Sequence, residues 1–173
     1  MKKKIELSII IVNFNTYRVL EFCLSSIYQG LLDNSLFEII VIDNNSKDDS
    51  VRQIKKNFPK VILLENKITE GFAVANNKAI NRSIGDFILF LNPDTKLNKN
   101  TLSSMLDFMK ENSGVGVATC LVNLVSGKID DACHRGFPTP WNAFCHFSGL
   151  SSVFSTSKFF NGYHLGYQEL NNI

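Results

Sequence analysis

Carboxylate and amide side chains follow three separate apolar runs in this sequence of 173 residues. Asp94 comes shortly after the run 87–91, and Asp43 comes directly after the run 37–42. A carboxylate held at the end of a rigid strand can bind a divalent cation, and that cation can neutralise a diphosphate. A second carboxylate can accept a hydrogen bond from a pyrimidine ring N–H. These residue types and their spacing favour a site for a nucleoside diphosphate and a metal ion.

The same apolar runs predict the strands that would position these side chains. Residues 7–12 form an apolar run broken only by Ser8, which is typical of a central strand. The run 87–91 contains no polar residue, so we expect it to be buried on both faces as in a parallel sheet. Pro93 cannot donate to a sheet ladder and is expected to end this strand. Further strands are predicted at 37–42, 61–64 and 115–121.

Segments with helical spacing alternate with these strands. Apolar residues in them recur three and four positions apart, which predicts one buried stripe on each helix. Such alternation of strands and helices favours an α/β fold, with a mainly parallel sheet and helices on both of its faces. Helices are expected over 17–27, from Ser46 or Asp48 to 58, over 71–83 and over 101–110.

In a parallel sheet the carboxyl ends of the strands lie along one edge, where open α/β sheets bind ligands. Asn, Asp and Ser are also common turn formers, so each polar cluster alone is equally consistent with a turn or a helix cap. Their joint placement after three strands is what favours a binding site. The three clusters are Asn13-Phe14-Asn15, Asp43-Asn44-Asn45-Ser46 and Asn92-Pro93-Asp94-Thr95.

Composition and charge exclude several classes of protein. The chain is 45% hydrophobic and 20% charged, as is ordinary for a soluble globular protein, and its formal net charge of +2 is too small to indicate nucleic-acid binding. No apolar run has the length of a transmembrane helix. Glu6, Asn13 and Asn15 interrupt the N-terminal run too early for a signal peptide. We therefore expect a cytoplasmic protein.

The spacing of cysteines and glycines disfavours other kinds of site. Four cysteines without scaffold-like spacing are expected to be reduced thiols. The pairs Cys133-His134 and Cys145-His146 leave a zinc site as an alternative, although adjacent Cys-His pairs fit the usual ligand spacing poorly. No Gly-x-Gly-x-x-Gly follows the first strand and there is no P-loop, so dehydrogenase and P-loop functions are disfavoured.

At these residues the chain resembles a family-2 glycosyltransferase with the GT-A fold, and within that family it most resembles the rhamnosyltransferase-like enzymes. The matching segments have the same order and spacing, and together they cover most of residues 5–125. They are Ser8-Ile9-Ile10-Ile11-Val12-Asn13-Phe14-Asn15, Glu38-Ile39-Ile40-Val41-Ile42-Asp43-Asn44-Asn45-Ser46, Gly71-Phe72-Ala73-Val74-Ala75-Asn76-Asn77 and Phe90-Leu91-Asn92-Pro93-Asp94-Thr95.

The resemblance implies roles for the residues at the strand ends. Asn13 and Asn15 would lie along the nucleotide, and Asp43 would contact the base. Residues 66–77 would line the donor pocket, where Gly71 would allow close approach of the backbone. The full implied set for nucleotide-sugar binding is Asn13, Asn15, Asp43, Asn45, Gly71, Asn76 and Asn92.

The resemblance also implies a metal site. Asn92-Pro93-Asp94 stands where the family has its Asp-x-Asp motif, but the first acid is replaced by Asn92. Asp94 is therefore implied as the single carboxylate ligand of Mn²⁺ or Mg²⁺.

Enzymes of this kind are expected to invert the anomeric centre in one displacement, with a carboxylate base that deprotonates the acceptor hydroxyl. Glu169 is the only acid after Asp131 and its neighbours do not match, so we expect the general base beyond Ile173. The chain would then be an N-terminal portion, with a donor-binding domain at 1–125 and the start of an acceptor-side region at 126–173. The implied partners are a UDP-sugar or dTDP-rhamnose donor and a glycan or lipid-linked saccharide acceptor.

Aromatic residues crowd the segment 137–163, and Phe144, Phe147, Leu150 and Phe154 could form one face of a helix. Such spacing is more typical of a core covered by further protein, but these residues could also lie near a lipid-linked acceptor at the inner face of the membrane. If left uncovered they would drive self-association.

Two other functions stay open at the level of the sequence. A module that binds a nucleoside diphosphate and metal without catalysis would need only the residues above. A nucleotidyltransferase uses a related α/β layout, but it would usually carry a glycine-rich basic loop where this chain has Asn13-Phe14-Asn15-Thr16.

Overall fold

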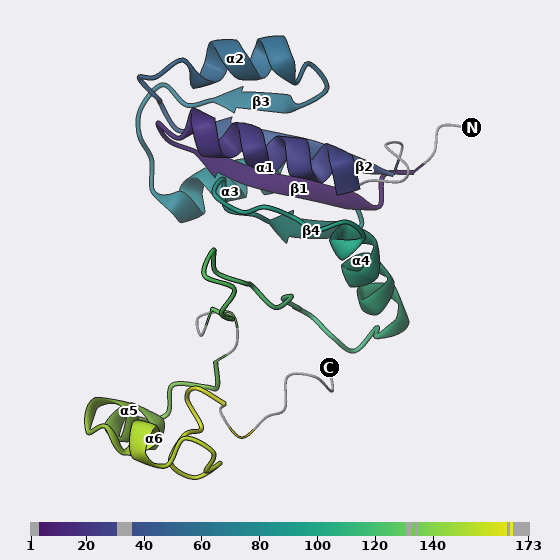
Figure 1. Ribbon diagram of the computed structural model, residues 1–173. Helices are drawn as coiled ribbons and strands as arrows, with labels where there is room; N and C mark the ends of the chain where they lie inside the picture. The colour runs from purple at the N-terminus through teal and green to yellow at the C-terminus, as the bar shows by residue number, and fades with distance from the viewer. Residues whose placement is uncertain (1–3, 31–35, 131–132, 134, 166, 168–173) are drawn as a thin grey trace. The chain divides into compact units, whose positions relative to one another are not determined.

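The computed structural model describes residues 4–30, 36–130, 133, 135–165 and 167 (Figure 1). The chain divides into two compact units, residues 1–116 and residues 117–173, which we call unit 1 and unit 2. Unit 1 holds the sheet and the helices around it, and unit 2 holds two short helices with their connecting loops.

Unit 1 is built on a four-stranded sheet in the order β3-β2-β1-β4. Every pairing in it is parallel, which confirms the predicted α/β fold, and the strand arrows in Figure 1 run side by side in one direction. β1 pairs with β2 from Leu7 opposite Phe37 to Asn13 opposite Asp43, so the polar residues that end these strands are neighbours. The strands are β1 Leu7–Asn13, β2 Phe37–Asp43, β3 Ile62–Glu65 and β4 Phe87–Phe90.

Helices cover both faces of the sheet, as predicted. On one face, Leu20, Cys23 and Leu24 of α1 pack against alternate residues of β1 and β2, together with one buried residue each from α2 and α4. On the other face, Ala75 and Ala79 of α3 pack against Ile10, Ile40 and Ile42, where their small side chains let the helix approach closely. The helices of unit 1 are α1 Tyr17–Gly30, α2 Ser50–Asn57, α3 Phe72–Ile80 and α4 Thr101–Glu111.

β4 is an edge strand, and the prediction that it is buried on both faces is wrong. Phe87 and Leu89 pack against the core under α1, but Ile88 and Phe90 on the other face are 38% and 52% exposed. The helix on that face, α3, packs on residues of β1 and β2. Within the described part of the chain, no strand pairs with the outer edge of β4. An apolar run thus marks the strand but does not determine whether neighbours cover both of its faces.

The predicted strand at 115–121 is also wrong for the described chain. These residues form no ladder, and only an isolated antiparallel bridge between Asn123 and Ile129 follows them. A turn follows at 126–128, where the amide of Gly127, at φ +81°, donates to the carbonyl of Leu124. A strand needs a hydrogen-bonding neighbour, and none of the described residues supplies one here.

Unit 2 contains α5, Pro140–Phe147, and α6, Leu150–Val153. Thr139 caps α5, because its side chain accepts a hydrogen bond from the amide of Asn142. The single helix expected to carry Phe144 to Phe154 is broken, since Gly149 between α5 and α6 adopts a left-handed conformation at φ +80°. No helix among the described residues has the length and apolar character to cross a membrane.

Candidate functional site

The loops that follow β1 and β2 are joined by a buried network of hydrogen bonds. The Asn13 amide donates to an Asp43 oxygen at 2.8 Å and to the Ser46 hydroxyl at 3.1 Å. The other Asp43 oxygen accepts from the Ser46 backbone N–H at 2.9 Å, and the Thr16 hydroxyl donates to the side-chain oxygen of Asn13 at 2.8 Å. Asn13 is completely buried and Asp43 is 2% exposed. Both Asp43 oxygens are therefore engaged by the protein itself.

Two asparagines in left-handed conformations shape the outer part of these loops. Asn15 has φ +55° and Asn45 has φ +65°, and each lies two residues past the end of its strand. Asn is among the few residues other than Gly that adopt this conformation readily. The Asn15 amide donates to the Ser46 hydroxyl, the Asn15 side-chain oxygen accepts from the Lys47 amide, and the Lys47 ammonium donates to the Asn45 side-chain oxygen. The loops therefore hold each other in one arrangement.

The carboxylate of Asp48 joins the starts of α1 and α2, the helices that follow these two loops. One of its oxygens accepts from the amide of Tyr17 at 3.3 Å, and the other accepts from the amide of Ser50 at 3.1 Å. These amides belong to the first residues of α1 and α2, so one carboxylate serves the N-termini of both helices. The sequence indicated Asp48 as a cap for α2 alone.

The side chain of Asn44, directly after β2, links the end of that strand to the segment between β3 and α3. Its side-chain N–H donates to the carbonyl of Glu70 at 2.9 Å, and its side-chain oxygen accepts from the amide of Glu70 at 3.0 Å and from the Asn66 amide group at 3.0 Å. Lys78 of α3 contacts both Glu70 and Asn66. Asn44 thus fixes the backbone that leads into α3. Sequence reasoning placed Asn44 and Ser46 in the right cluster but could not identify these partners.

Two predicted contact residues, Gly71 and Asn76, lie in α3 or at its start. Gly71 has φ −62° and ψ 147°, which any residue can adopt, and the space that a side chain would occupy there is open. The fold therefore does not require glycine at this position. Asn76 is 7% exposed, and its amide donates to the carbonyl of Phe72 one turn earlier at 2.9 Å. Its side chain thus supports the helix.

The loop after β4 has a different character. Asn92 and Asp94 are both exposed, and within the described part of the chain the Asp94 carboxylate has no hydrogen-bond or ion-pair partner. Beneath the loop, the buried Cys23 thiol of α1 contacts the carbonyl of Asn92 at 3.7 Å. Burial, and to a lesser degree the nearby Asp94 carboxylate, raise the pKa of Cys23 to about 12, so the thiol stays protonated at neutral pH.

The donor set at this loop fits a hard divalent cation whose other ligands come from elsewhere. No group of three or more His, Cys, Asp or Glu side chains that could hold a metal ion occurs among the described residues. Mg²⁺ and similar ions are commonly bound by one or two carboxylates, with water and substrate phosphates completing the shell. Asp94, with the Asn92 amide oxygen close to it in sequence, matches that pattern.

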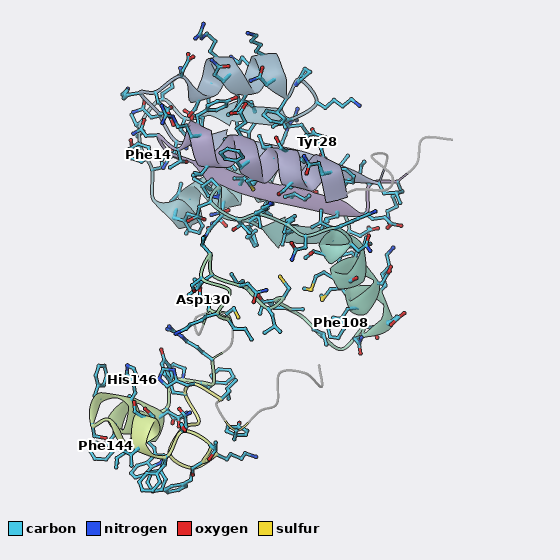
Figure 2. The ribbon with its side chains drawn as sticks, viewed as in Figure 1. Phe14, Tyr28, Phe108, Asp130, Phe144 and His146 are labelled. Carbon is cyan, nitrogen blue, oxygen red and sulfur yellow. The ribbon has the colours of Figure 1, made fainter. Side chains whose placement is uncertain are left out.

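Exposed apolar side chains stand among these polar groups. Phe14 is 47% exposed, and Figure 2 shows it at the end of the sheet to which the strand arrows point. Phe72, at the start of α3, is 62% exposed. An exposed aromatic ring beside hydrogen-bonding groups can stack on a base. Sequence reasoning missed Phe14, although its position between Asn13 and Asn15 was a usable signal.

A shallow depression of about 460 Å³ lies around the first turn of α1. It includes Asn15, but none of the other predicted site residues. The depression therefore does not coincide with the edge that carries Asp94. Its lining residues are Asn15, Thr16, Tyr17, Arg18, Val19, Asp48 and Asp49.

The family model for glycosyl transferase family 2 matches residues 8–165, which is most of the chain. This chain belongs to glycosyl transferase family 2. The match confirms the family inferred from the four sequence segments. It spans both units and includes every residue predicted to bind the nucleotide sugar or metal.

Individual relatives agree with the family assignment. The poly(ribitol-phosphate) beta-glucosyltransferase of Bacillus spizizenii is 28% identical over 137 residues, which make up 77% of this chain and 20% of that protein. The crystal structure of Staphylococcus aureus TarS 1–349 in complex with UDP-GlcNAc has a TM-score of 0.57 at 22% identity, covering 71% of this chain and 42% of TarS 1–349.

A third protein extends the structural likeness. The mannosyltransferase PcManGT from Pyrobaculum calidifontis, in complex with GDP-Man and Mn²⁺, has a TM-score of 0.56 at 22% identity and covers 62% of this chain and 33% of that one. The structural likenesses establish that the family 2 chain has the GT-A fold. The chain spans about a fifth of the length of the Bacillus relative. The rhamnosyltransferase-like resemblance stays a prediction.

Proposed function

We propose that this chain binds the donor in an inverting, metal-dependent family 2 glycosyltransferase. The donor would be a UDP-sugar or dTDP-rhamnose, and the acceptor a glycan or lipid-linked saccharide. One observation carries the proposal: the linked loops after β1 and β2 share a sheet edge with the exposed Asp94 after β4, whose carboxylate has no partner among the described residues. A rigid polar edge beside a free carboxylate suits a nucleotide whose diphosphate needs a cation.

The burial of the predicted residues separates those that hold the loops in place from those that could contact the nucleotide sugar. Asn13, Asp43 and Asn76 bond to other parts of the protein, so we assign them to holding the loops and α3 in place. We assign direct contact with the nucleotide sugar to Asn15, Asn45 and Asn92, which are at least partly exposed. The backbone at Gly71 would face the donor, because the fold leaves its side-chain position open.

Asp94 is the residue we propose for the metal, with Mn²⁺ or Mg²⁺ as the ion. The ion would stabilise the negative charge that develops on the departing nucleoside diphosphate. Asp94 would hold it at the carboxyl end of β4, and the Cys23 thiol beneath would keep the loop seated by donating to the Asn92 carbonyl. We assign no general base within the described residues, and its predicted position remains beyond Ile173.

Titration calorimetry with UDP and with dTDP, each with and without Mn²⁺, tests this proposal. We expect binding of at least one of the two that strengthens when Mn²⁺ is present. A parallel assay of donor turnover separates two functions, because binding without turnover would support the alternative of a non-catalytic module. Absence of binding to both nucleotides in the presence of Mn²⁺ would contradict both functions.

We also propose that the protein works in the cytoplasm at the inner face of the membrane. All four cysteines are free thiols in the structure, which agrees with a reducing compartment. Fractionation of cells that express the chain would test this, and recovery only from an extracellular or periplasmic fraction would contradict it.

A further inference from the structure

The segment 66–70, which we call the β3–α3 loop, is held at both of its ends. At the first end, the Asn66 backbone N–H donates to the Asp43 carbonyl at 2.9 Å, and the Asn66 side-chain amide donates to the Asn44 side-chain oxygen at 3.0 Å. At the other end, the backbone N–H and carbonyl of Glu70 both bond to the Asn44 side chain. Asn44 is only 6% exposed. One buried side chain therefore closes the loop.

A lysine of α3, Lys78, closes the β3–α3 loop a second time. Its ammonium donates to the side-chain oxygen of Asn66 at 2.9 Å. It also lies 2.7 Å and 2.6 Å from the two carboxylate oxygens of Glu70, whose side chain is 19% exposed. An ammonium group has three hydrogens, and here three oxygens lie within reach of them. Lys78 is therefore engaged by the loop, with no donor left for a ligand.

The middle of the β3–α3 loop is open, in contrast to its ends. Lys67, Ile68 and Thr69 are exposed, and their side chains have no hydrogen-bond or ion-pair partner within the described residues. Gly71, which follows the loop, has open space at its side-chain position. A loop whose ends are already fixed loses little backbone freedom when it binds a ligand. The β3–α3 loop is therefore built as a preorganised binding element.

We propose that Lys78 is a positioning residue for the donor site. By pairing with Glu70 and Asn66, it holds the β3–α3 loop in the arrangement that receives the nucleotide sugar, and it makes no contact with the donor itself. This role rests on the proposed donor binding, because the loop begins at the carboxyl end of β3 and leads to Gly71. A direct contact between Lys78 and the diphosphate, or a role in stability alone, would give different results in the following measurements.

A double-mutant cycle on the pair tests the role of Lys78. Calorimetry with UDP and dTDP in the presence of Mn²⁺ compares Glu70→Met, Lys78→Met and the double variant with the wild type. Each single change should weaken the binding of whichever nucleotide the wild type binds by about fivefold, and the double variant should be no weaker than either, because the pair acts as a unit. Lys78→Arg, which can bond both Glu70 oxygens, should recover most of the affinity.

A second lysine–glutamate pair beside β3 provides the matched control. The ammonium of Lys55 on α2 lies 2.7 Å from the carboxylate of Glu65, the last residue of β3. Lys55→Met removes an ion pair of the same kind that does not touch the β3–α3 loop. It should leave nucleotide affinity within about twofold of the wild type, since an exposed ion pair contributes little.

The loop can also be followed without any nucleotide. The Glu70 backbone N–H donates to the Asn44 side chain, so its hydrogen exchange reports whether the loop stays closed. We expect exchange at this position to be about fivefold faster in Lys78→Met than in the wild type, while the amides of β1 exchange at wild-type rates. Faster exchange in both places would indicate a loss of global stability instead of a displaced loop.

Four results would overturn the role of Lys78. Wild-type affinity in both single variants would refute it and leave donor binding intact. Weaker binding in Lys78→Met together with unchanged or stronger binding in Glu70→Met would assign Lys78 to the diphosphate directly. Unchanged exchange at the Glu70 amide would show that Lys78 does not hold the loop, whatever the nucleotide results. Absence of binding by the wild type would contradict donor binding itself, and this role with it.

Discussion

The loops after β1 and β2 and the loop after β4 lie at the same edge of the sheet but are built differently. In the first pair, Asn13, Asp43 and Ser46 bond to one another and lie largely out of solvent. In the loop after β4, the side chains of Asn92 and Asp94 are exposed. The contacts from α1 reach the backbone of this loop: the Cys23 thiol lies at the Asn92 carbonyl, and the Ser26 hydroxyl accepts from the Leu97 amide. Asp43 and Asp94 both lie at or after the end of a strand, yet of these two carboxylates only Asp94 is accessible.

This difference separates two roles that look alike in sequence. A buried carboxylate whose oxygens accept from the protein contributes to stability and holds loop geometry. An exposed carboxylate without partners contributes little to stability and remains available to a ligand. Substitutions at Asp43 and Ser46 should therefore affect folding first, and substitutions at Asp94 and Asn92 should affect metal and nucleotide binding with the fold intact.

The largest expected effect belongs to Asp43→Ala. The change removes the closer of the two acceptors of the buried Asn13 side-chain amide and leaves the Ser46 N–H without its acceptor, so the free energy of unfolding should fall by about 3 kcal/mol. Urea unfolding measures it. Asp107→Ala on the exposed face of α4 is the control and should change stability by no more than about 0.5 kcal/mol. Similar stabilities for the two variants would contradict the structural role of Asp43.

Asp94→Asn should weaken metal-dependent nucleotide binding and leave stability unchanged, in contrast to Asp43→Ala. We expect the gain in UDP or dTDP affinity on adding Mn²⁺ to fall by about tenfold or more, which is roughly 1.4 kcal/mol, because the carboxylate ligand is lost. The urea midpoint should not change, since the carboxylate has no partner within the described residues. Calorimetry with and without Mn²⁺ checks the first outcome. An unchanged metal dependence would reduce Asp94 to a turn residue.

The sequence was sufficient for the strands and helices of unit 1 but not for this division of roles. Apolar runs and helical spacing located β1 to β4 and α1 to α4. The pairing of Asn13 with Asp43 depends on the register of two strands thirty residues apart in the chain, which no local pattern encodes. Two carboxylates after strands therefore appeared equivalent until their partners were known.

The two wrong predictions, that β4 is buried on both faces and that 115–121 forms a strand, also arise from contacts that are distant in the chain. Apolar content predicts that a segment prefers to be covered, but coverage depends on elements elsewhere in the chain. Ile88 and Phe90 face a side of the sheet where α3 packs on β1 and β2, and Val117 has no strand beside it within the described residues. Both segments have the composition of strands in a larger sheet.

Ser46→Ala should have an intermediate effect. Its hydroxyl accepts from the Asn13 side chain and the Asn15 amide, so its removal should cost about 1 kcal/mol of stability. UDP affinity should fall a few-fold, equally with and without Mn²⁺, because loop geometry changes while Asp94 does not. Ser46→Thr keeps the hydroxyl and should recover both properties. A loss confined to the Mn²⁺ experiments would place Ser46 at the metal instead.

The smallest expected effect, and the one that sharpens the comparison most, is a gain of function in Asn92→Asp. This change places a second carboxylate in a loop that already exposes its side chains, so Mn²⁺ affinity should rise a few-fold, about 0.5 to 1 kcal/mol. Stability should stay within about 0.5 kcal/mol of the wild type, because the Asn92 side chain has no partner among the described residues.

The control is Asn45→Asp, which adds the same charge to the loop after β2. If the loop after β4 is the metal site, Asn92→Asp should strengthen Mn²⁺ binding more than Asn45→Asp does. Equal gains in the two variants would mean that added charge alone attracts the ion, and the distinction between the loops would fail.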